Sequence, residues 1–170
     1  MQQKKRLFVS KFTMEKTFSL NYNFYDSWKH LEFQDQLLVE KAYEISKNAY
    51  APYSEFHVGA AIFLENGEYL LGSNQENIAY PSGLCAERVV LFYAGSSFPN
   101  IKIETLCVVA KGDLLPFEQI LSPCGACRQV MLETEIRQGQ GFRVILVSQD
   151  GKTLVFKNSR DLLPFAFGTV

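Results

Sequence analysis

The pattern of apolar and polar residues predicts a helix over residues 33–49. Within it, Leu38, Ala42 and Ile45 recur at helical spacing, and charged residues lie largely on the other side. Pro52 then stops the helix. We expect this segment to pack against the rest of the protein and to carry no chemistry of its own.

Five apolar runs further along the chain predict strands. They cover residues 57–64, 68–73, 104–111, 143–148 and 153–157. An Asn-Gly pair at residues 66–67 joins the first two as a hairpin, and helices are predicted to begin near Cys85 and Cys124. A short helix over residues 159–163 ends at Pro164. Strands and helices mixed in this way, without an internal repeat, predict one α/β layer structure with a sheet of about five strands.

Composition and charge exclude several classes of protein. A chain of 170 residues fits one domain with a proper core. The formal net charge of −1 gives no general attraction to nucleic acid or to an anionic membrane. No segment approaches the ~20 apolar residues that span a bilayer, and the apolar run after Lys4, Lys5 and Arg6 is too short for a signal peptide. The sequence therefore predicts a cytoplasmic protein, in which four cysteines indicate metal or thiol chemistry more often than disulfides.

Three of the four cysteines are spaced to bind one zinc ion. If Cys124 opens a helix, Cys127 lies one turn later on the same face. Cys85 also precedes a helical run, so two helix N-termini would meet at the metal. Three protein ligands leave the fourth tetrahedral position open for water, which is typical of catalytic rather than structural zinc. A Cys-x-x-Cys pair alone could be a redox pair, but Cys85 favours the metal interpretation.

Two residues beside Cys85 supply what such a site needs. Glu87 does not share a helix face with Cys85, but it can lie beside the water and act as general acid and base. Arg88 is the candidate to offset the net negative charge of three thiolates around Zn²⁺. Cys107 lies in an apolar run and is predicted to be a buried core residue rather than a fourth ligand.

The zinc motif belongs to a longer resemblance. The first ligand, one residue, a glutamate and then Pro-Cys-x-x-Cys is the pattern of zinc deaminases, here in an all-cysteine form. From about Phe33 to the C-terminus, the chain resembles the small cytidine deaminases in five ordered blocks. These blocks are residues 51–61, 72–77, 80–88, 122–130 and 162–168. The resemblance implies a three-layer α/β/α fold with a mixed sheet, a domain over residues 33–170, and an N-terminal extension over residues 1–32.

The extension has two possible structures. Apolar residues alternate weakly from Thr17 to Tyr25, so this part could add an edge strand to the sheet. A flexible extension is the alternative. The sequence assigns the extension no function.

The resemblance also implies the reaction and the substrate contacts. Cytidine or deoxycytidine would be hydrolysed to uridine or deoxyuridine and ammonia, in pyrimidine salvage, with Glu87 carrying a proton from the attacking water to N3 of the base. Seven positions match the family's substrate-binding residues. They are Asn74 and Glu76 at the ribose hydroxyls, Phe56 against the nucleoside, the Ala86 carbonyl at the exocyclic amine, Tyr53 and Tyr80 near the site, and Phe167 stacked on the base.

The resemblance further implies a homotetramer with one zinc ion per subunit, in which Phe167 reaches the site of a neighbouring subunit. Two positions depart from the family pattern. His57 stands where proline is common and is expected to face away from the ligand, and the bulky Phe165 is expected to change the subunit contact. Two alternatives stay open: a deaminase of another aminated nucleoside such as an antibiotic, and a non-catalytic zinc-binding module.

Overall fold

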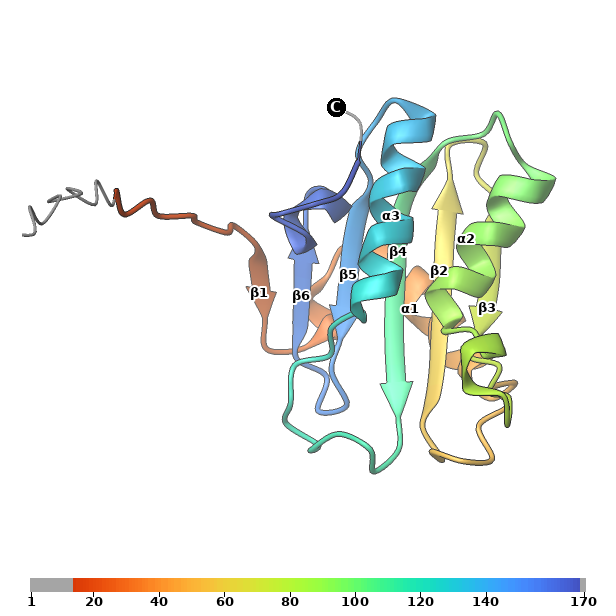
Figure 1. Ribbon diagram of the computed structural model, residues 1–170. Coiled ribbons are helices and arrows are strands. Elements are labelled where there is room, and N and C mark those ends of the chain that lie inside the picture. Colours follow the sequence, from red (N-terminus) through yellow and green to blue (C-terminus); the bar gives the residue numbers. More distant parts are fainter. Residues whose placement is uncertain (1–13, 169–170) are drawn as a thin grey trace, which may run out of the picture.

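The computed structural model describes residues 14–168 and shows a mixed sheet between two layers of helices (Figure 1). The sheet order is β1-β6-β5-β4-β2-β3. Its strands are β1 (Asn23–Tyr25), β2 (His57–Leu64), β3 (Tyr69–Ser73), β4 (Ile103–Lys111), β5 (Arg143–Val147) and β6 (Thr153–Phe156). Only β4 and β5 run parallel, and the other neighbours are antiparallel. The predicted three-layer α/β/α class is confirmed.

In the described part of the chain, three α-helices cover the sheet. They are α1 (Phe33–Ser46) on one face, and α2 (Ala86–Ser97) and α3 (Gly125–Gln138) on the other. Three short 3-10 segments, η1 (Trp28–His30), η2 (Tyr80–Ser82) and η3 (Ser159–Leu162), lie in the connections. No helix within residues 14–168 is long and apolar enough to cross a membrane.

Two glycines set how closely the helices approach the sheet. A Cβ at Gly59 on β2 would overlap the Ala42 carbonyl of α1. A Cβ at Gly72 on β3 would lie 2.9 Å from the backbone nitrogen of Val90 and 3.0 Å from the carbonyl oxygen of Ala86. Because glycine has no Cβ, the backbone of α2 can lie directly on the sheet.

The sheet has six strands, where the sequence predicted about five. The additional strand, β1, occupies the end of the weakly alternating segment and pairs antiparallel with β6, with Phe24 opposite Leu154. The ring of Tyr22 packs against that of Phe156, with centroids 5.6 Å apart. A strand of three residues with one pairing partner leaves little periodic signal in a sequence, which explains the difference.

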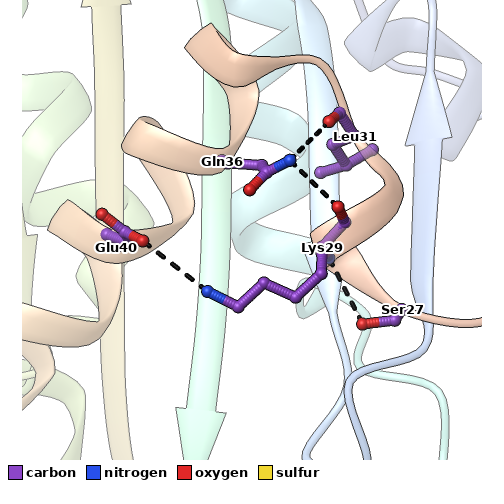
Figure 2. Close-up of polar contacts among 5 residues, drawn as sticks. All are labelled: Ser27, Lys29, Leu31, Gln36 and Glu40. Atoms are coloured by element: carbon purple, nitrogen blue, oxygen red, sulfur yellow. Dashed lines mark hydrogen bonds and ion pairs between the residues drawn. The ribbon is translucent and has the colours of Figure 1, made fainter.

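The segment after β1 is fixed to α1 (Figure 2). Ser27 caps η1 by accepting a hydrogen bond from the backbone of Lys29 at 3.2 Å. The amide of Gln36 on α1 donates to the carbonyls of Lys29 at 2.9 Å and Leu31 at 2.8 Å, and Lys29 forms an ion pair with Glu40 at 3.7 Å. Residues 27–31 therefore belong structurally to the α1 layer.

Candidate functional site

The metal ligands lie at the starts of two helices. Cys85 is the N-cap of α2 and Cys124 is the N-cap of α3. The sulfur of Cys124 accepts a hydrogen bond from the backbone N–H of Cys127 at 3.4 Å. Because the first N–H groups of a helix lack intrahelical partners, both positions favour thiolates.

The three sulfurs are spaced for zinc. The Sγ atom of Cys124 lies 3.9 Å from that of Cys85 and 3.4 Å from that of Cys127, and all three lie within 4.8 Å of one another. Tetrahedral zinc with bonds of about 2.3 Å would place its sulfur ligands about 3.8 Å apart. No other histidine, cysteine or carboxylate in the described part of the chain joins this cluster. The donor set therefore fits a zinc ion with one position left for water.

The pKa values of Cys85 and Cys127 are shifted in opposite directions. A hydrogen bond from Cys127 and the Arg88 guanidinium, which lies 3.8 Å from the Cys85 sulfur, together lower the pKa of Cys85 to about 5. The same hydrogen bond and burial raise the pKa of Cys127. Cys107 lies elsewhere, in the core on the α1 face of the sheet, where burial raises its pKa above the ordinary value.

Glu87 is the second residue of α2 and is only 4% exposed. Burial raises its pKa to about 7, because a charged carboxylate is poorly solvated there. A carboxyl group with this pKa can both accept and donate a proton near neutral pH.

A cavity of about 650 Å³ opens beside the cysteines, a size suited to a small ligand such as a nucleoside. Most of the predicted site residues line it. They are Tyr53, Phe56, Asn74, Glu76, Tyr80, Cys85, Glu87, Arg88 and Cys124. The structure thus brings the predicted metal, acid/base and substrate residues around one space.

The two polar residues predicted at the ribose already have protein partners. Asn74 accepts from the backbone N–H of Val58 at 2.8 Å and donates to the carbonyl of Phe56 at 2.9 Å. Glu76 accepts from the backbone N–H of Tyr53 at 2.9 Å and from the hydroxyl of Ser54. The Ser54 hydroxyl bond is the largest cause that lowers the pKa of Glu76. Both side chains therefore shape the cavity wall as well as facing it.

The aromatic residues divide into two groups. Phe56 is buried in the wall, and Tyr53 and Tyr80 meet edge to face with centroids 6.1 Å apart. Phe167 is 89% exposed and its neighbour Phe165 is 93% exposed. Gln129 on α3 donates to the Phe167 carbonyl at 2.7 Å. Phe167 thus lies at the surface of the protein and does not line the cavity.

Three of the predicted site residues, Cys127, Ala86 and Phe167, do not line the cavity. The Ala86 carbonyl is directed along α2 toward Gly72, because carbonyl groups point toward the C-terminal end of a helix. The role of that carbonyl as acceptor for the exocyclic amine stays a prediction. His57 also lies outside the lining, whereas Phe56 and Val58 belong to it, as the alternation of side chains predicts.

One wall of the cavity was not predicted from the sequence. Leu114, Leu115, Leu121 and Ser122 line it from the loop between β4 and α3. This loop has no helical or strand period that would have singled it out. The only available signal was its position, directly before the Pro-Cys-x-x-Cys motif.

Comparisons with known proteins agree with this site. Residues 32–140 match the sequence model of the cytidine and deoxycytidylate deaminase zinc-binding region. The chain is 35% identical over 132 residues to a cytidine deaminase of Mycobacterium tuberculosis, and the matched region covers 78% of this chain and 88% of the relative. A cytidine deaminase of Halalkalibacterium halodurans is 41% identical over 98 residues, 58% of this chain and 70% of the relative.

A solved structure agrees as well. The crystal structure of a cytidine deaminase from Burkholderia pseudomallei matches with a TM-score of 0.67 and 36% identity, covering 78% of this chain and 98% of that one. The chain therefore belongs to the cytidine and deoxycytidylate deaminase family of zinc-binding proteins.

Proposed function

We propose that this protein is a zinc-dependent hydrolase that converts cytidine and deoxycytidine to uridine and deoxyuridine with release of ammonia. The observation that carries this function is the buried Glu87 beside a three-cysteine cluster with an open position, at one end of a nucleoside-sized cavity. The alternatives, a deaminase of a nucleoside antibiotic and a non-catalytic zinc module, are not favoured by the relatives, which are named cytidine deaminases.

Cys85, Cys124 and Cys127 would hold the metal, and zinc bound there would supply a water of lowered pKa. Glu87 would take a proton from the attacking water and deliver it to N3 of the cytosine ring. It would then take the second proton from the hydroxyl group now bonded to C4 and give it to the leaving amine, so that the C4 carbonyl forms as ammonia departs. The pKa of Glu87, near 7, supports both directions of transfer. The Arg88 guanidinium, next to the Cys85 sulfur, would offset part of the negative charge of the thiolates.

Asn74 and Glu76 would bind the ribose hydroxyls, and Phe56, Tyr53 and Tyr80 would enclose the nucleoside. These assignments are supported by the position of all five side chains on the cavity wall. The fixed carboxylate of Glu76 keeps acceptor sites beyond those used by Tyr53 and Ser54.

The assembly, location and domain boundary are also part of the proposal. A homotetramer is supported by Phe167, which is exposed, does not line the cavity of its own chain, and would complete the site of a neighbouring subunit. Free thiols at a metal cluster support a cytoplasmic location, where cysteines stay reduced. The deaminase domain would cover residues 33–170, with residues 1–32 as an extension to it.

An ultraviolet assay with cytidine, deoxycytidine and a nucleoside antibiotic in parallel tests the reaction. We expect the absorbance band of both natural nucleosides to decline with time and ammonia to appear in equal amount. Glu87→Ala serves as the control, because it keeps the metal ligands and removes the acid/base. A zinc-loaded protein that leaves both natural nucleosides intact would refute the proposed substrate, and activity on the antibiotic alone would replace it.

A further inference from the structure

The loop between β4 and α3, residues 112–124, forms an apolar wall of the cavity. Leu114, Leu115 and Leu121 line the cavity from this loop. The loop contains no helix or strand of its own, so the hydrogen bonds within it cannot fix its course. Something outside the loop must hold it in place.

The side chain of Gln149, in the turn between β5 and β6, holds the first half of the loop. Its amide oxygen accepts from the backbone N–H of Gly112 at 3.0 Å. Its amide nitrogen donates to the Gly112 carbonyl at 2.9 Å and to the Leu115 carbonyl at 3.2 Å. One half-buried side chain therefore satisfies three backbone groups of a segment that faces the ligand.

The turn that carries Gln149 is itself anchored. Ser148 is 1% exposed, and its hydroxyl accepts from the backbone N–H of Leu121, further along the same loop, at 3.0 Å. Gly151 closes the turn by donating to the Ser148 carbonyl at 2.9 Å, and its own carbonyl accepts from Trp28 at 3.0 Å. The Gln149 amide thus extends from a rigid base.

Gly112 also brings the loop against the opposite wall. Its φ of +136° favours glycine, and a Cβ there would overlap the Glu55 carbonyl and lie 3.0 Å from the Cα atom of Phe56. Lys111 pairs with His57 in the β2–β4 ladder, so the sheet already sets the separation between Gly112 and the segment that carries Phe56. Gln149 continues from this fixed point and holds the next part of the loop through the Leu115 carbonyl. We propose that Gln149 is a positioning residue that sets the width of the nucleoside cavity through the β4–α3 loop.

The second half of the loop is held by a different residue. Arg128 on α3 donates to the Pro123 carbonyl at 2.9 Å, to the Ser122 hydroxyl at 2.7 Å and to the Leu162 carbonyl at 3.0 Å. Cys124 and the metal end are therefore anchored independently of Gln149. Loss of the Gln149 contacts should weaken nucleoside binding and leave the chemical step nearly intact, which raises KM and spares kcat.

Gln138 provides a matched control at the other end of β4. It is also half-buried, accepts from the backbone N–H of Ile103 at 3.0 Å, and donates to the carbonyls of Ile103 at 3.1 Å and Gln140 at 2.8 Å. Gln149→Met and Gln138→Met thus remove the same three kinds of hydrogen bond with the same change in shape. Only Gln149 touches the wall of the cavity.

The test compares the two variants in steady-state kinetics and in amide hydrogen exchange, each with the zinc-loaded protein. In Gln149→Met we expect KM for cytidine to rise about tenfold with kcat within about twofold of wild type. We also expect faster exchange across residues 112–121. Gln138→Met should lose comparable thermal stability without either change. Gln149→Glu keeps the acceptor for Gly112 but turns a carboxylate oxygen toward the carbonyls of Gly112 and Leu115, so its KM should rise at least as much.

Equal KM values in the two methionine variants, or unchanged exchange across residues 112–121 in Gln149→Met, would overturn the proposal. If Gln149→Met does not fold, Gln149→Glu decides by the same two measurements. The kinetic part rests on the proposed deaminase activity, whereas hydrogen exchange needs no substrate. An inactive wild type would therefore refute the proposed function, and the exchange contrast would still decide whether Gln149 holds the loop.

Discussion

The two ends of the cavity are built in different ways. The metal end consists of the first turns of α2 and α3, so Cys85, Glu87 and Cys124 are placed by helix geometry. The nucleoside end consists largely of connecting segments, among them residues 53–56 and 112–122. Its polar side chains are already bonded to neighbouring backbone. Rigid elements thus carry the chemistry, while loops that brace one another determine the shape of the binding space.

The pKa values of two carboxylates illustrate the difference between the metal end and the nucleoside end. Burial raises the pKa of Glu87 to about 7, whereas the Ser54 hydroxyl bond lowers the pKa of Glu76 below its ordinary value. Glu87 can therefore exchange a proton near neutral pH, and Glu76 stays charged as a permanent acceptor. Changes at the metal end should abolish the reaction, and changes at the nucleoside end should weaken binding.

The largest effect is expected on removing a metal ligand. Cys127→Ala should lose bound zinc, activity and thermal stability together, because one ion serves both catalysis and the junction of α2 with α3. Zinc content by atomic absorption, kcat and the melting temperature measure the three losses. Cys107→Ala is the control, because Cys107 is also fully buried but lies on the α1 face. Full zinc content in Cys127→Ala would contradict the three-cysteine site.

The next effect is expected at Glu87. Glu87→Gln should keep one zinc ion per chain and lower kcat by about 10²–10⁴-fold, the usual contribution of a general acid/base. Glu135→Gln is a matched control, because Glu135 is equally buried, at 3% exposed, and lies outside the cavity. Its carboxylate accepts hydrogen bonds from the backbone N–H groups of Phe142 at 3.0 Å and Ser159 at 2.6 Å. That variant should lose stability and keep kcat. Equal losses of kcat in the two variants would show that Glu87 has no acid/base role and acts only as a buried structural carboxylate.

The contrast between the two ends also explains what the sequence could predict. Two of the metal ligands follow from short-range spacing, because Cys124 and Cys127 lie on one turn of helix. Cys85, 39 residues before Cys124, was joined to them by the zinc-deaminase pattern. The strand β2 was predicted with its observed bounds, His57–Leu64, because its apolar run is long and clearly bounded. Features that depend on local periodicity can be read from one sequence.

The nucleoside end depends on contacts that no local pattern contains. The backbone partners of Glu76 lie more than twenty residues earlier, and Gln149 lies 37 residues after Gly112. The loop wall itself has no period. Its residues were missed because distant side chains, rather than its own sequence, place them at the cavity.

The nucleoside end gives a smaller expected effect at Glu76. Glu76→Gln should raise KM for cytidine roughly tenfold with little change in kcat, because the loss falls on binding common to ground and transition states. The sharper measurement repeats the assay with 2′,3′-dideoxycytidine, which lacks the 2′ and 3′ hydroxyls of the ribose. If Glu76 binds one of these hydroxyls, Glu76→Gln should raise KM much less for this substrate than for cytidine. The same fold-change in KM with both nucleosides would show that Glu76 shapes the cavity wall and binds neither hydroxyl.

The smallest effect is expected at Ser54, whose hydroxyl donates to Glu76 and accepts from the backbone of Phe56 at 3.1 Å. Ser54→Ala should raise the pKa of Glu76 back toward its ordinary value of about 4.5. A carboxylate whose pKa is lowered by folding stabilises the protein above that ordinary value, and the contribution disappears as the pH falls through the lowered pKa.

The variant should therefore melt roughly 1–3 °C below wild type at pH 7. The difference should shrink as the pH falls through the lowered pKa of Glu76, toward the part due to the lost Phe56 contact. Melting curves of both proteins at matched pH values measure it, and any acid loss of zinc enters both curves alike. A difference that grows toward low pH would mean that the Ser54 hydroxyl does not favour the charged form of Glu76. The nucleoside end would then lack the fixed negative charge that distinguishes it from the metal end.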